Sequence, residues 1–358
     1  MLRLGVCGLT SDHVWSMVGG FFTLGEKVEV VAAAEPYHPE LLERAKADWA
    51  VQRTYTEYET LLQKEEVDAV VICANNRDKA EIVRIAARCG RHVMTDKPMA
   101  ATLAQAAQME RDAAEAGIHL MVAYHNAFSP MYAAVKQLIA QGAIGTVYLA
   151  KGGIGHAGPR EIHCSEAFCE WLFDKRLNGG GCFVDEACYL INLYRNYVGE
   201  IARVGAITSQ MGWRDYLPPD VEDNSVAILQ FESGALGTID AKWGQIGPYP
   251  ISSSFHGTEG TIILSRGEFQ VFSPKQLPAG LQGWVRVVDS SRTSGRGGAE
   301  QRHFVDVVKG RAALMPEVSP AGALRTQAVI EAVYEAAASA RIVSVADVLR
   351  QHAPEAVA

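Results

Sequence analysis

The chain has 358 residues and a formal net charge of −8 at pH 7, with 48% hydrophobic and 21% charged residues. This length predicts two domains, because single hydrophobic cores usually stop growing near about 250 to 300 residues. The acidic balance argues against a nucleic-acid-binding protein, which needs clustered Lys and Arg to neutralise phosphates. No run of about 18 apolar residues occurs, so we expect no membrane span.

The cysteines favour a reducing compartment. The chain has seven, without any C-x-x-C pair, and several stand in apolar runs such as Val71–Cys73. They predict reduced and mostly buried thiols. The first residues are typical of a strand and carry no signal-peptide pattern. We therefore expect a cytoplasmic protein.

Residues 1–124 alternate short apolar runs with longer amphipathic stretches. This alternation predicts βαβ units and a doubly wound parallel sheet of the Rossmann type. The predicted strands are residues 2–6, 28–33, 69–72, 92–94 and 119–122. The predicted helices are residues 39–49, 57–63, 78–89 and 103–116. Ligands of such sheets bind beyond the carboxyl ends of the strands.

Residues 125–358 form a second predicted domain with a different pattern. Period-two runs predict a largely antiparallel sheet, and so an α/β domain. The predicted strands are residues 146–151, 203–208, 225–231, 235–241, 260–264 and 284–288. One helix is expected from the glycine run at residues 179–181 to about Tyr197, and residues 299–340 are expected to be helical and to pack partly on the first domain. Residues 290–298 predict a surface loop.

The first strand leads into a glycine-bearing turn. Gly8, Leu9, Thr10, Ser11 and His13 stand where the pyrophosphate of a dinucleotide meets a helix N-terminus. With Gly8 as the first glycine of a G-x-G-x-x-G fingerprint, Thr10 and His13 occupy the two other glycine positions. The Thr10 hydroxyl or the His13 ring could contact phosphate directly. A tight turn without a ligand is the alternative for this segment.

Glu35 follows the second strand, where an acid would accept hydrogen bonds from a ribose diol. The next residues, Pro36-Tyr37-His38, offer no Arg or Lys for a 2′-phosphate, so NAD is favoured over NADP. A solvated loop acid is the alternative. The predicted cofactor-binding residues also include Asn75, Asn76, Asp96 and Lys97.

Two motifs carry the candidate chemistry. Lys97 follows an apolar strand, and Asp185 and Tyr189 follow the glycine run with i,i+4 spacing on one predicted helix face. A lysine that faces an acid and a phenol can handle one proton beside a reacting carbon. The alternatives are a solvated loop lysine and a structural Asp-Tyr pair.

These motifs resemble the glucose-fructose oxidoreductase and inositol dehydrogenase family (Gfo/Idh/MocA). The resemblance covers nearly the whole chain. It rests on the segments Asp68-Ala69-Val70-Val71-Ile72, Gly90-Arg91-His92-Val93-Met94, Asp96-Lys97-Pro98, Trp171, Asp174, the run from Gly179 to Asp185, His303-Phe304 and the helix at residues 328–338. The chain departs from the family pattern in its glycine fingerprint and at Asn75-Asn76-Arg77-Asp78-Lys79.

The resemblance implies an N-terminal Rossmann domain and a C-terminal domain that binds substrate and forms homo-oligomers, dimers or tetramers, through its open sheet. It also implies NAD(P)-linked oxidation or reduction of a sugar, polyol or related secondary alcohol. The family's catalytic lysine falls on Lys97 and its aspartate on Asp185, while Tyr189 replaces its histidine. We expect Lys97 to hold the reacting oxygen, Tyr189 to relay the proton and Asp185 to orient the alcohol or the ammonium.

Polar and aromatic residues outside this triad are candidates for binding a polyhydroxylated ring. They are Tyr124, His125, Asn126, His156, His163 and Trp171, with core packing or surface exposure as the alternatives. The spacing of His156, His163, Cys164, Glu166 and Cys169 matches no zinc module, so no metal is expected. Two other functions stay open: an NAD-recycling lyase or glycosidase, and a non-catalytic sensor of nucleotide or sugar.

Overall fold

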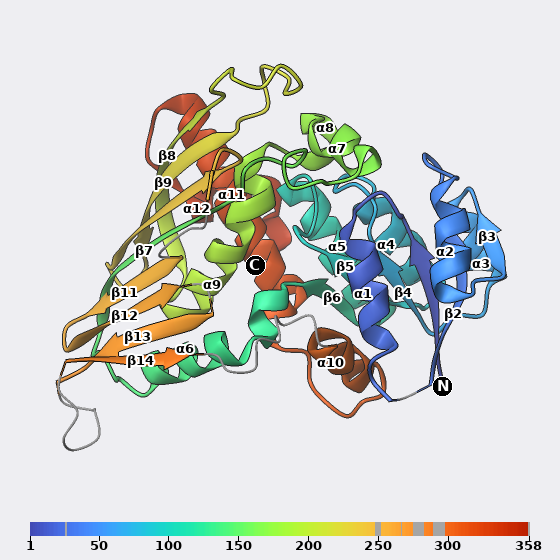
Figure 1. The fold of residues 1–358 in the computed structure, drawn as a ribbon, viewed down its shortest axis with the longest axis horizontal. Coiled ribbons are helices and arrows are strands. Elements are labelled where there is room, and N and C mark those ends of the chain that lie inside the picture. The colour runs from blue at the N-terminus through green and yellow to red at the C-terminus, as the bar shows by residue number, and fades with distance from the viewer. Residues whose placement is uncertain (26, 248–251, 266, 275–282, 289–297, 357–358) are drawn as a thin grey trace. The chain divides into compact units, whose positions relative to one another are not determined.

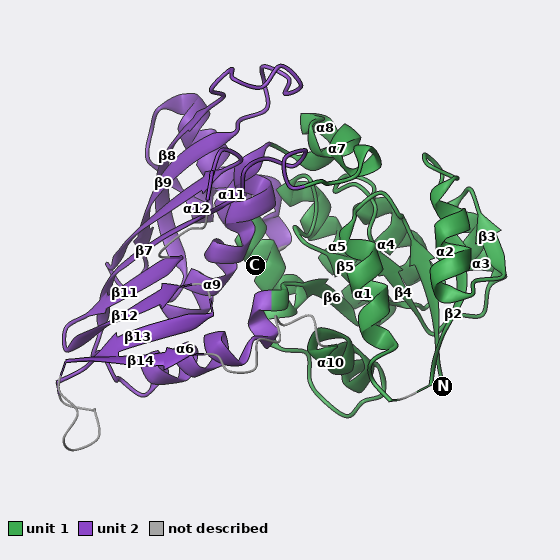
Figure 2. Cartoon of the chain, viewed as in Figure 1, with its two compact units in different colours: residues 1–125, 163–180, 295–327 green, residues 126–162, 181–294, 328–358 purple. Residues whose placement is uncertain are grey.

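The computed structural model describes residues 1–358 apart from 26, 248–251, 266, 275–282, 289–297 and 357–358. The predicted loop at residues 290–298 lies outside the described residues except for Gly298. The chain forms two compact units (Figure 2). Unit 1 contains residues 1–125, 163–180 and 295–327, and unit 2 contains residues 126–162, 181–294 and 328–358. Two later segments thus belong with the first 125 residues.

Unit 1 is built on a six-stranded sheet in the order β3-β2-β1-β4-β5-β6, with every pair parallel (Figure 1). This order confirms the predicted Rossmann architecture. Its strands are β1 (Leu2–Cys7), β2 (Val28–Ala34), β3 (Arg53–Tyr55), β4 (Ala69–Ile72), β5 (His92–Asp96) and β6 (Leu120–Ala123). The helices among them are α1 (His13–Phe21), α2 (Leu41–Trp49), α3 (Tyr58–Lys64), α4 (Lys79–Arg88) and α5 (Leu103–Ala116).

Local sequence explains these elements. All four residues of β4 are buried, as expected for a parallel strand that is covered on both faces. Helix α5 begins where the Thr102 side chain accepts a hydrogen bond from the Gln105 backbone and ends at Gly117, which has a φ of 65°. Strand β3 was missed because its three residues form no apolar run.

The later segments of unit 1 pack against the Rossmann sheet's first helix and turns. In α10 (Ala299–Val308), the Gln301 amide donates to the Met17 carbonyl at 2.9 Å, and the Phe304 and Phe21 rings lie 6.3 Å apart. In the segment at residues 163–180, the Ser165 backbone donates to the Asp12 carboxylate at 2.7 Å. This segment carries α7 (Glu166–Leu172) and α8 (Lys175–Asn178).

Unit 2 contains a nine-stranded sheet in the order β14-β13-β12-β11-β7-β10-β9-β8-β15. The β7–β10 pair is parallel and the other pairs are antiparallel, which confirms the predicted mostly antiparallel sheet. Its strands are β7 (Val147–Gly155), β8 (Ile201–Ser209), β9 (Asn224–Phe231), β10 (Leu236–Lys242), β11 (Ser253–Gly257), β12 (Gly260–Ser265), β13 (Glu268–Phe272), β14 (Trp284–Val288) and β15 (Val343–Ser344). Strands β11, β13 and β15 were not predicted.

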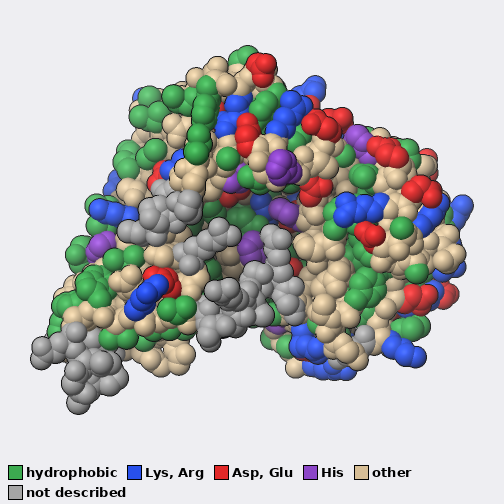
Figure 3. All heavy atoms as spheres, in the orientation of Figure 1, with side chains coloured by type: hydrophobic (Ala, Val, Ile, Leu, Met, Phe, Trp, Pro, Cys, Tyr) green, Lys and Arg blue, Asp and Glu red, His purple; other side chains and the backbone are tan. Residues whose placement is uncertain are grey.

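The remaining helices include α6 (Pro130–Ala140), α9 (Cys188–Tyr197), α11 (Pro320–Ser339) and α12 (Val345–His352). The short turns are η1 (His125–Phe128), η2 (Phe183–Ala187), η3 (Pro316–Val318) and η4 (Pro354–Ala356). Apolar side chains also reach the surface along the unit 2 sheet (Figure 3). Within the described part of the chain, the helices are too short or too polar to cross a membrane.

Candidate active site

The turn between β1 and α1 is closed by the end of β4. Gly8 has a φ of 88°, and a Cβ atom there would lie 2.4 Å from the backbone nitrogen of Ala74, so this position requires glycine. The Gly8 N–H donates to the Ala34 carbonyl at 2.9 Å, and the Ser11 N–H donates to the Cys73 carbonyl at 3.2 Å. The turn is therefore held to both neighbouring strands without the other two glycines of the fingerprint.

The N-terminus of α1 fits a phosphate group. Asp12 does not cap this helix, because its carboxylate accepts the hydrogen bond from Ser165 instead. The first backbone N–H groups of α1 thus have no competing cap from Asp12, and such groups bind anions. Thr10 and Ser11 are buried at 4% and 0% exposure, whereas His13 is half-buried. Of these three side chains, His13 presents the most surface to a ligand.

Asp96 joins this turn to the segment that carries Lys97. One carboxylate oxygen accepts hydrogen bonds from Ser11 Oγ at 3.0 Å and faces His13 Nδ1 at 2.9 Å, while the other accepts the Lys97 N–H at 2.9 Å. Burial acts to raise the pKa of Asp96, but the nearby His13, Lys79 and Lys97 outweigh it and hold that pKa well below its usual range. Lys97 itself is buried, with 4% exposed.

Glu35 lies in the interior of unit 1, with 0% of its surface exposed. One carboxylate oxygen accepts the Leu9 N–H at 2.6 Å, and the other accepts the Tyr37 and His38 N–H groups at 2.9 and 3.3 Å. The residue therefore ties the nucleotide turn to the turn after β2. Its predicted contact with ribose stays a prediction, and it requires Tyr37 or a neighbour to move aside.

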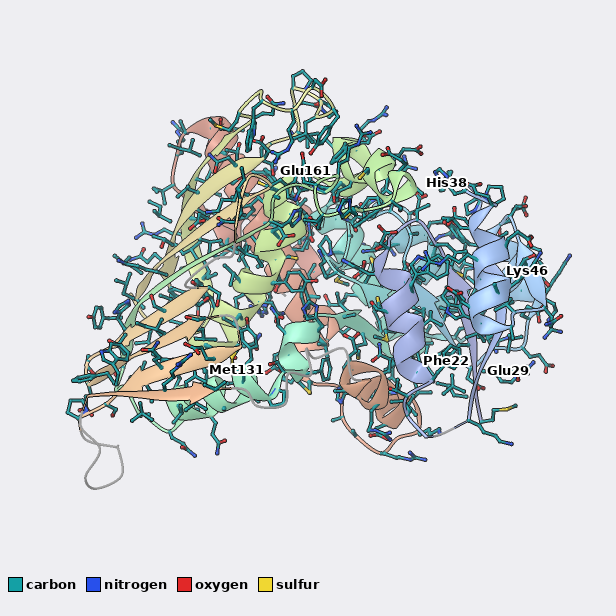
Figure 4. All side chains as sticks on the ribbon, viewed as in Figure 1. Phe22, Glu29, His38, Lys46, Met131 and Glu161 are labelled. Atoms are coloured by element: carbon teal, nitrogen blue, oxygen red, sulfur yellow. The ribbon has the colours of Figure 1, made fainter. Side chains whose placement is uncertain are left out.

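His38, labelled in Figure 4, follows Glu35 and joins two segments of unit 1. Its ring nitrogens lie 2.9 Å from Glu40 Oε1 and 2.9 Å from Glu170 Oε2. Burial lowers the pKa of His38, but the hydrogen bonds to Glu40 and Glu170 outweigh it, so the pKa is raised. The two carboxylates therefore favour the charged form of this ring more than water does.

Asn75 and Asn76 bind protein groups in the turn after β4. Asn75 donates to the Asp78 carboxylate at 2.8 Å. Asn76 donates to the side chain and the backbone carbonyl of Asn178 at 2.8 and 3.1 Å, and Asn178 donates to the Gly180 carbonyl at 2.8 Å. This chain of amides connects the β4 turn to the start of the glycine run.

In unit 2 the end of the glycine run is held by Glu222. Its carboxylate accepts the N–H groups of Gly181 at 2.8 Å and Phe183 at 3.1 Å and the Tyr334 hydroxyl at 2.7 Å, and its carbonyl accepts the Cys182 N–H at 2.9 Å. A Cβ atom on Gly181 would lie 2.0 Å from the Glu222 carbonyl oxygen. Burial raises the pKa of Glu222, and these hydrogen bonds offset that effect only in part.

Asp185 lies in η2, which is a π-helical turn, rather than in the regular α-helix that was predicted. Such turns often occur at functional sites. Asp185 is 7% exposed, and its Oδ2 accepts a hydrogen bond from the indole of the buried Trp243 at 3.2 Å. Tyr189 follows in α9 and is half-buried. Lys97 belongs to unit 1, whereas Asp185 and Tyr189 belong to unit 2.

His156 and Glu186 form a pair beside Asp185. His156 Nε2 lies 3.2 Å from Glu186 Oε1, and the ligand atoms of all three residues lie within 4.8 Å of one another. The Gly158 N–H donates to His156 Nδ1 at 3.1 Å, so a neutral ring carries its proton on Nε2, facing Glu186. A metal ion would need the lone pair of that same nitrogen. The geometry is therefore that of a hydrogen-bonded pair.

The loop that follows β7 is held near this pair by a separate ion pair. Glu161, labelled in Figure 4, accepts hydrogen bonds from Arg214 Nε at 2.9 Å and from the Tyr216 hydroxyl at 2.7 Å. Burial acts to raise the pKa of Glu161, but these two donors outweigh it and lower the pKa. The loop between His156 and Ile162 is thus anchored at its far end.

The predicted substrate residues have different environments. Tyr124 is 1% exposed and His163 is exposed, with a φ of 65°. His125 and Asn126 are half-buried and begin η1. Trp171 is 7% exposed, and its indole N–H has no hydrogen-bond acceptor among the described residues. A buried donor without an acceptor is unusual, so the Trp171 indole is a candidate to meet a polar ligand.

Several residues around the site were missed by sequence reasoning: Lys79, Glu186, Glu222, Trp243 and Tyr334. Lys79 carried one signal, since a lysine at the start of a helix is electrostatically unfavourable. Glu222 and Tyr334 gave none, because their hydrogen bonds join segments far apart in the sequence.

Family models match most of the chain. Residues 2–124 match the oxidoreductase family with an NAD-binding Rossmann fold, and residues 132–263 match a Gfo/Idh/MocA C-terminal domain. Similar proteins include a levoglucosan dehydrogenase from Pseudarthrobacter phenanthrenivorans, 27% identical over 75% of this chain and 74% of its own length. A myo-inositol 2-dehydrogenase from Thermotoga maritima is 23% identical over 73% of this chain and 75% of its own length.

The fold agrees with these matches. A levoglucosan dehydrogenase solved in complex with NADH and levoglucosan superimposes with a TM-score of 0.82 at 24% identity, over 96% of this chain and 98% of that one. Lys97 after β5 and the glycine run before Asp185 are among the features on which the sequence resemblance rested, whereas the turn at Gly8 departs from the family's glycine pattern. The chain therefore belongs to the Gfo/Idh/MocA family of oxidoreductases, with an NAD-binding Rossmann domain.

Proposed function

We propose that the protein oxidises a secondary alcohol of a cyclic sugar or polyol, with NAD preferred over NADP and with Lys97, Asp185 and Tyr189 as its catalytic residues. The supporting observation is the position of Lys97, which is buried after β5 and bonded through its N–H to Asp96, the residue that also binds Ser11 and His13 of the nucleotide turn. A lysine fixed in this way stands beside the turn where the family binds NAD.

The residues of unit 1 suit a dinucleotide. The uncapped N-terminus of α1 would bind the pyrophosphate, and Glu35 and Tyr37 would lie at the ribose. When bound, NAD supplies the nicotinamide that exchanges a hydride with the substrate. The Lys97 ammonium would hold the substrate oxygen and stabilise negative charge that develops on it, because a preorganised cation needs no reorientation during the reaction.

The residues of unit 2 suit proton transfer and orientation. Trp243 fixes one oxygen of Asp185, so the carboxylate has a defined direction in which to accept a hydrogen bond from a substrate hydroxyl. The Tyr189 phenol would pass on the alcohol proton, for which it needs a nearby cation because its ordinary pKa is about 10. The buried Trp171 N–H would donate to a further hydroxyl of the ring.

Relatives set the substrate class to try first. Their names point to levoglucosan, myo-inositol, D-apiose and D-xylose, all of which carry several hydroxyls. We propose a substrate of this kind, and a homo-oligomer formed through the exposed face of the unit 2 sheet. One test offers each of these compounds with NAD or NADP and follows the absorbance of the reduced nucleotide.

Replacement of Lys97 tests the proposed mechanism. In Lys97→Ala, kcat on the best compound of this panel should fall by about 10²-fold or more, because a charge-stabilising group is lost from the transition state. The Kd for NAD should stay within about threefold. Lys46→Ala, which removes a half-buried lysine of α2, serves as the control. Turnover at the wild-type rate in Lys97→Ala would contradict the catalytic role proposed for Lys97.

A second function is favoured by the His156–Glu186 pair. Next to Asp185 it adds an acid-base pair that simple alcohol oxidation does not need. An elimination or a glycosidic cleavage with recycled NAD would use such a pair to protonate a leaving group. Product formation without net accumulation of NADH would favour this function over oxidation.

A further inference from the structure

A lysine with no exposed surface contacts the turn that carries Lys97. Lys79 is the first residue of α4 and is 0% exposed. Its Nζ donates to Asn76 Oδ1 at 2.8 Å, to the Asp96 carbonyl at 2.8 Å and to the Pro98 carbonyl at 2.9 Å, and the Lys97 carbonyl lies at 3.3 Å. An ammonium has three N–H donors, which is the number of the shortest contacts.

This position carries two electrostatic costs. Removing an ammonium from water is unfavourable unless good acceptors surround it, and a cation at the N-terminus of a helix meets the positive end of the helix dipole. The acceptors that offset these costs are consecutive carbonyls of residues 96–98 and the amide of Asn76. A charged Lys79 is therefore stable only with one particular conformation of residues 96–98. That backbone conformation depends on Lys79 as well.

We propose that Lys79 is a positioning residue, whose buried ammonium fixes the backbone on both sides of Lys97 and so holds the Lys97 side chain at its place of action. The carbonyls of Asp96 and Pro98 flank Lys97, and both are bound to one nitrogen atom. The inference rests on the proposed role of Lys97 for its effect on catalysis, but its effect on the backbone does not depend on that role.

The same nitrogen also links this turn to the glycine run. Asn76, which accepts from Lys79, donates to Asn178, and its carbonyl accepts the Ala101 N–H at 3.2 Å. Asn178 in turn donates to the Gly180 carbonyl at 2.8 Å. Loss of the ammonium should therefore loosen residues 96–101 more than the body of α4, which is held by its apolar face.

Hydrogen exchange tests this inference directly. In Lys79→Met, three acceptors lose their donor, so the backbone amides of Lys97 and Ala101 should exchange at least about tenfold faster than in the wild-type protein. Lys79→Gln keeps one donor nitrogen with two N–H groups, so its exchange rates should lie between those of the wild-type protein and Lys79→Met. Val83→Ala removes a fully buried side chain from the same helix without touching the turn, and serves as the control for general destabilisation.

Kinetics supply the second measurement. In Lys79→Met, kcat should fall by about 10²-fold with little change in the Kd for NAD, whereas Val83→Ala should keep kcat within about twofold. Exchange at residues 96–101 that is no faster in Lys79→Met than in Val83→Ala would overturn the inference. If Lys79→Met does not fold, Lys79→Gln is compared with Val83→Ala instead. Exchange rates in Lys79→Gln equal to those of the wild-type protein would then overturn the inference.

The two proposals fail in different ways. Full turnover in Lys97→Ala would remove the proposed function and leave the exchange result for Lys79 intact. If Lys97→Ala is inactive while hydrogen exchange and kcat in Lys79→Met equal those of the wild-type protein, only the role of Lys79 is contradicted.

Discussion

At the scale of single residues, Asp96 holds together the candidate site residues that lie in unit 1. Its two oxygens receive Ser11, His13 and the Lys97 backbone, and three nearby basic groups favour its charged form. An ionised carboxylate with several donors is costly to protonate, because each donor then loses part of its partner. The free energy of unfolding should therefore fall at acid pH.

This dependence has a definite sign. The unfolded carboxyl has a pKa of about 3.9, and the folded pKa of Asp96 is lower. Its stabilising contribution is therefore present above about pH 4 and is lost as the pH falls toward the folded value. In Asp96→Asn, the fall in the free energy of unfolding between about pH 4 and 2, measured by urea titration, should be shallower by about 1.4 kcal/mol per pH unit.

Asp48→Asn, at an exposed acid of α2, is the control and should leave this slope nearly unchanged. An Asp96→Asn variant with the wild-type slope would show that the carboxylate is not held in its charged form by the fold.

At the scale of elements, the turn η2 is fixed by acceptors from two distant segments. Glu222 and Tyr334 bind the consecutive N–H groups of residues 181–184, because the Tyr334 hydroxyl also accepts the Val184 N–H at 3.1 Å. These N–H groups would otherwise be unpaired donors at the start of a helix. The position of Asp185 thus depends on Glu222.

Replacement of Glu222 tests this dependence. Glutamine keeps one acceptor oxygen and turns an NH₂ group toward a backbone donor, so Glu222→Gln should lower the free energy of unfolding by about 1 to 3 kcal/mol. The measurement is urea unfolding followed by circular dichroism. Glu232→Gln, at an exposed position, is the matched control. Equal stability of the two variants would contradict the role given to Glu222.

At the scale of the whole molecule, the unit 2 sheet has an exposed apolar face. Alternate residues of β8 and β9, which lie near the β15 edge of the sheet, point to that face, and Ile207 pairs with Val226. The exposed apolar residues of these strands and their neighbours are Tyr148, Ile207, Val226, Ile228 and Leu236. Exposed apolar residues on neighbouring strands are typical of a protein interface.

A charge on this face should therefore weaken the proposed oligomer. Ile228, which is 53% exposed, lies near its middle. Ile228→Lys should shift sedimentation toward the monomer mass of 38.8 kDa, because an ammonium would have to be buried in the interface. Phe22→Lys, at an exposed position in unit 1 (Figure 4), should leave the assembly unchanged. A wild-type protein that sediments as a monomer would contradict the proposed interface.

The periodic segments of this fold could be predicted from sequence, and the short or irregular ones could not. Helix α5 was predicted at its observed bounds because residues 103–116 form a continuous pattern rich in Ala, Gln and Glu, and in the structure Thr102 and Gly117 cap its two ends. Strand β11 (Ser253–Gly257), with two serines and a histidine, is a strand because β7 and β12 pair with it on either side. The π-helical form of η2 likewise depends on Glu222 and Tyr334.

The sequence alone determined the two-part architecture, the family, and the candidate residues Lys97, Asp185 and Tyr189, because strand and helix periods and short motifs are encoded by neighbouring residues. Tertiary structure decided which groups support them. The buried cation Lys79 and the anchor Glu222 act on residues 17 to 41 positions away. Such contacts form only when separate strands and helices pack, so no local sequence pattern predicts them.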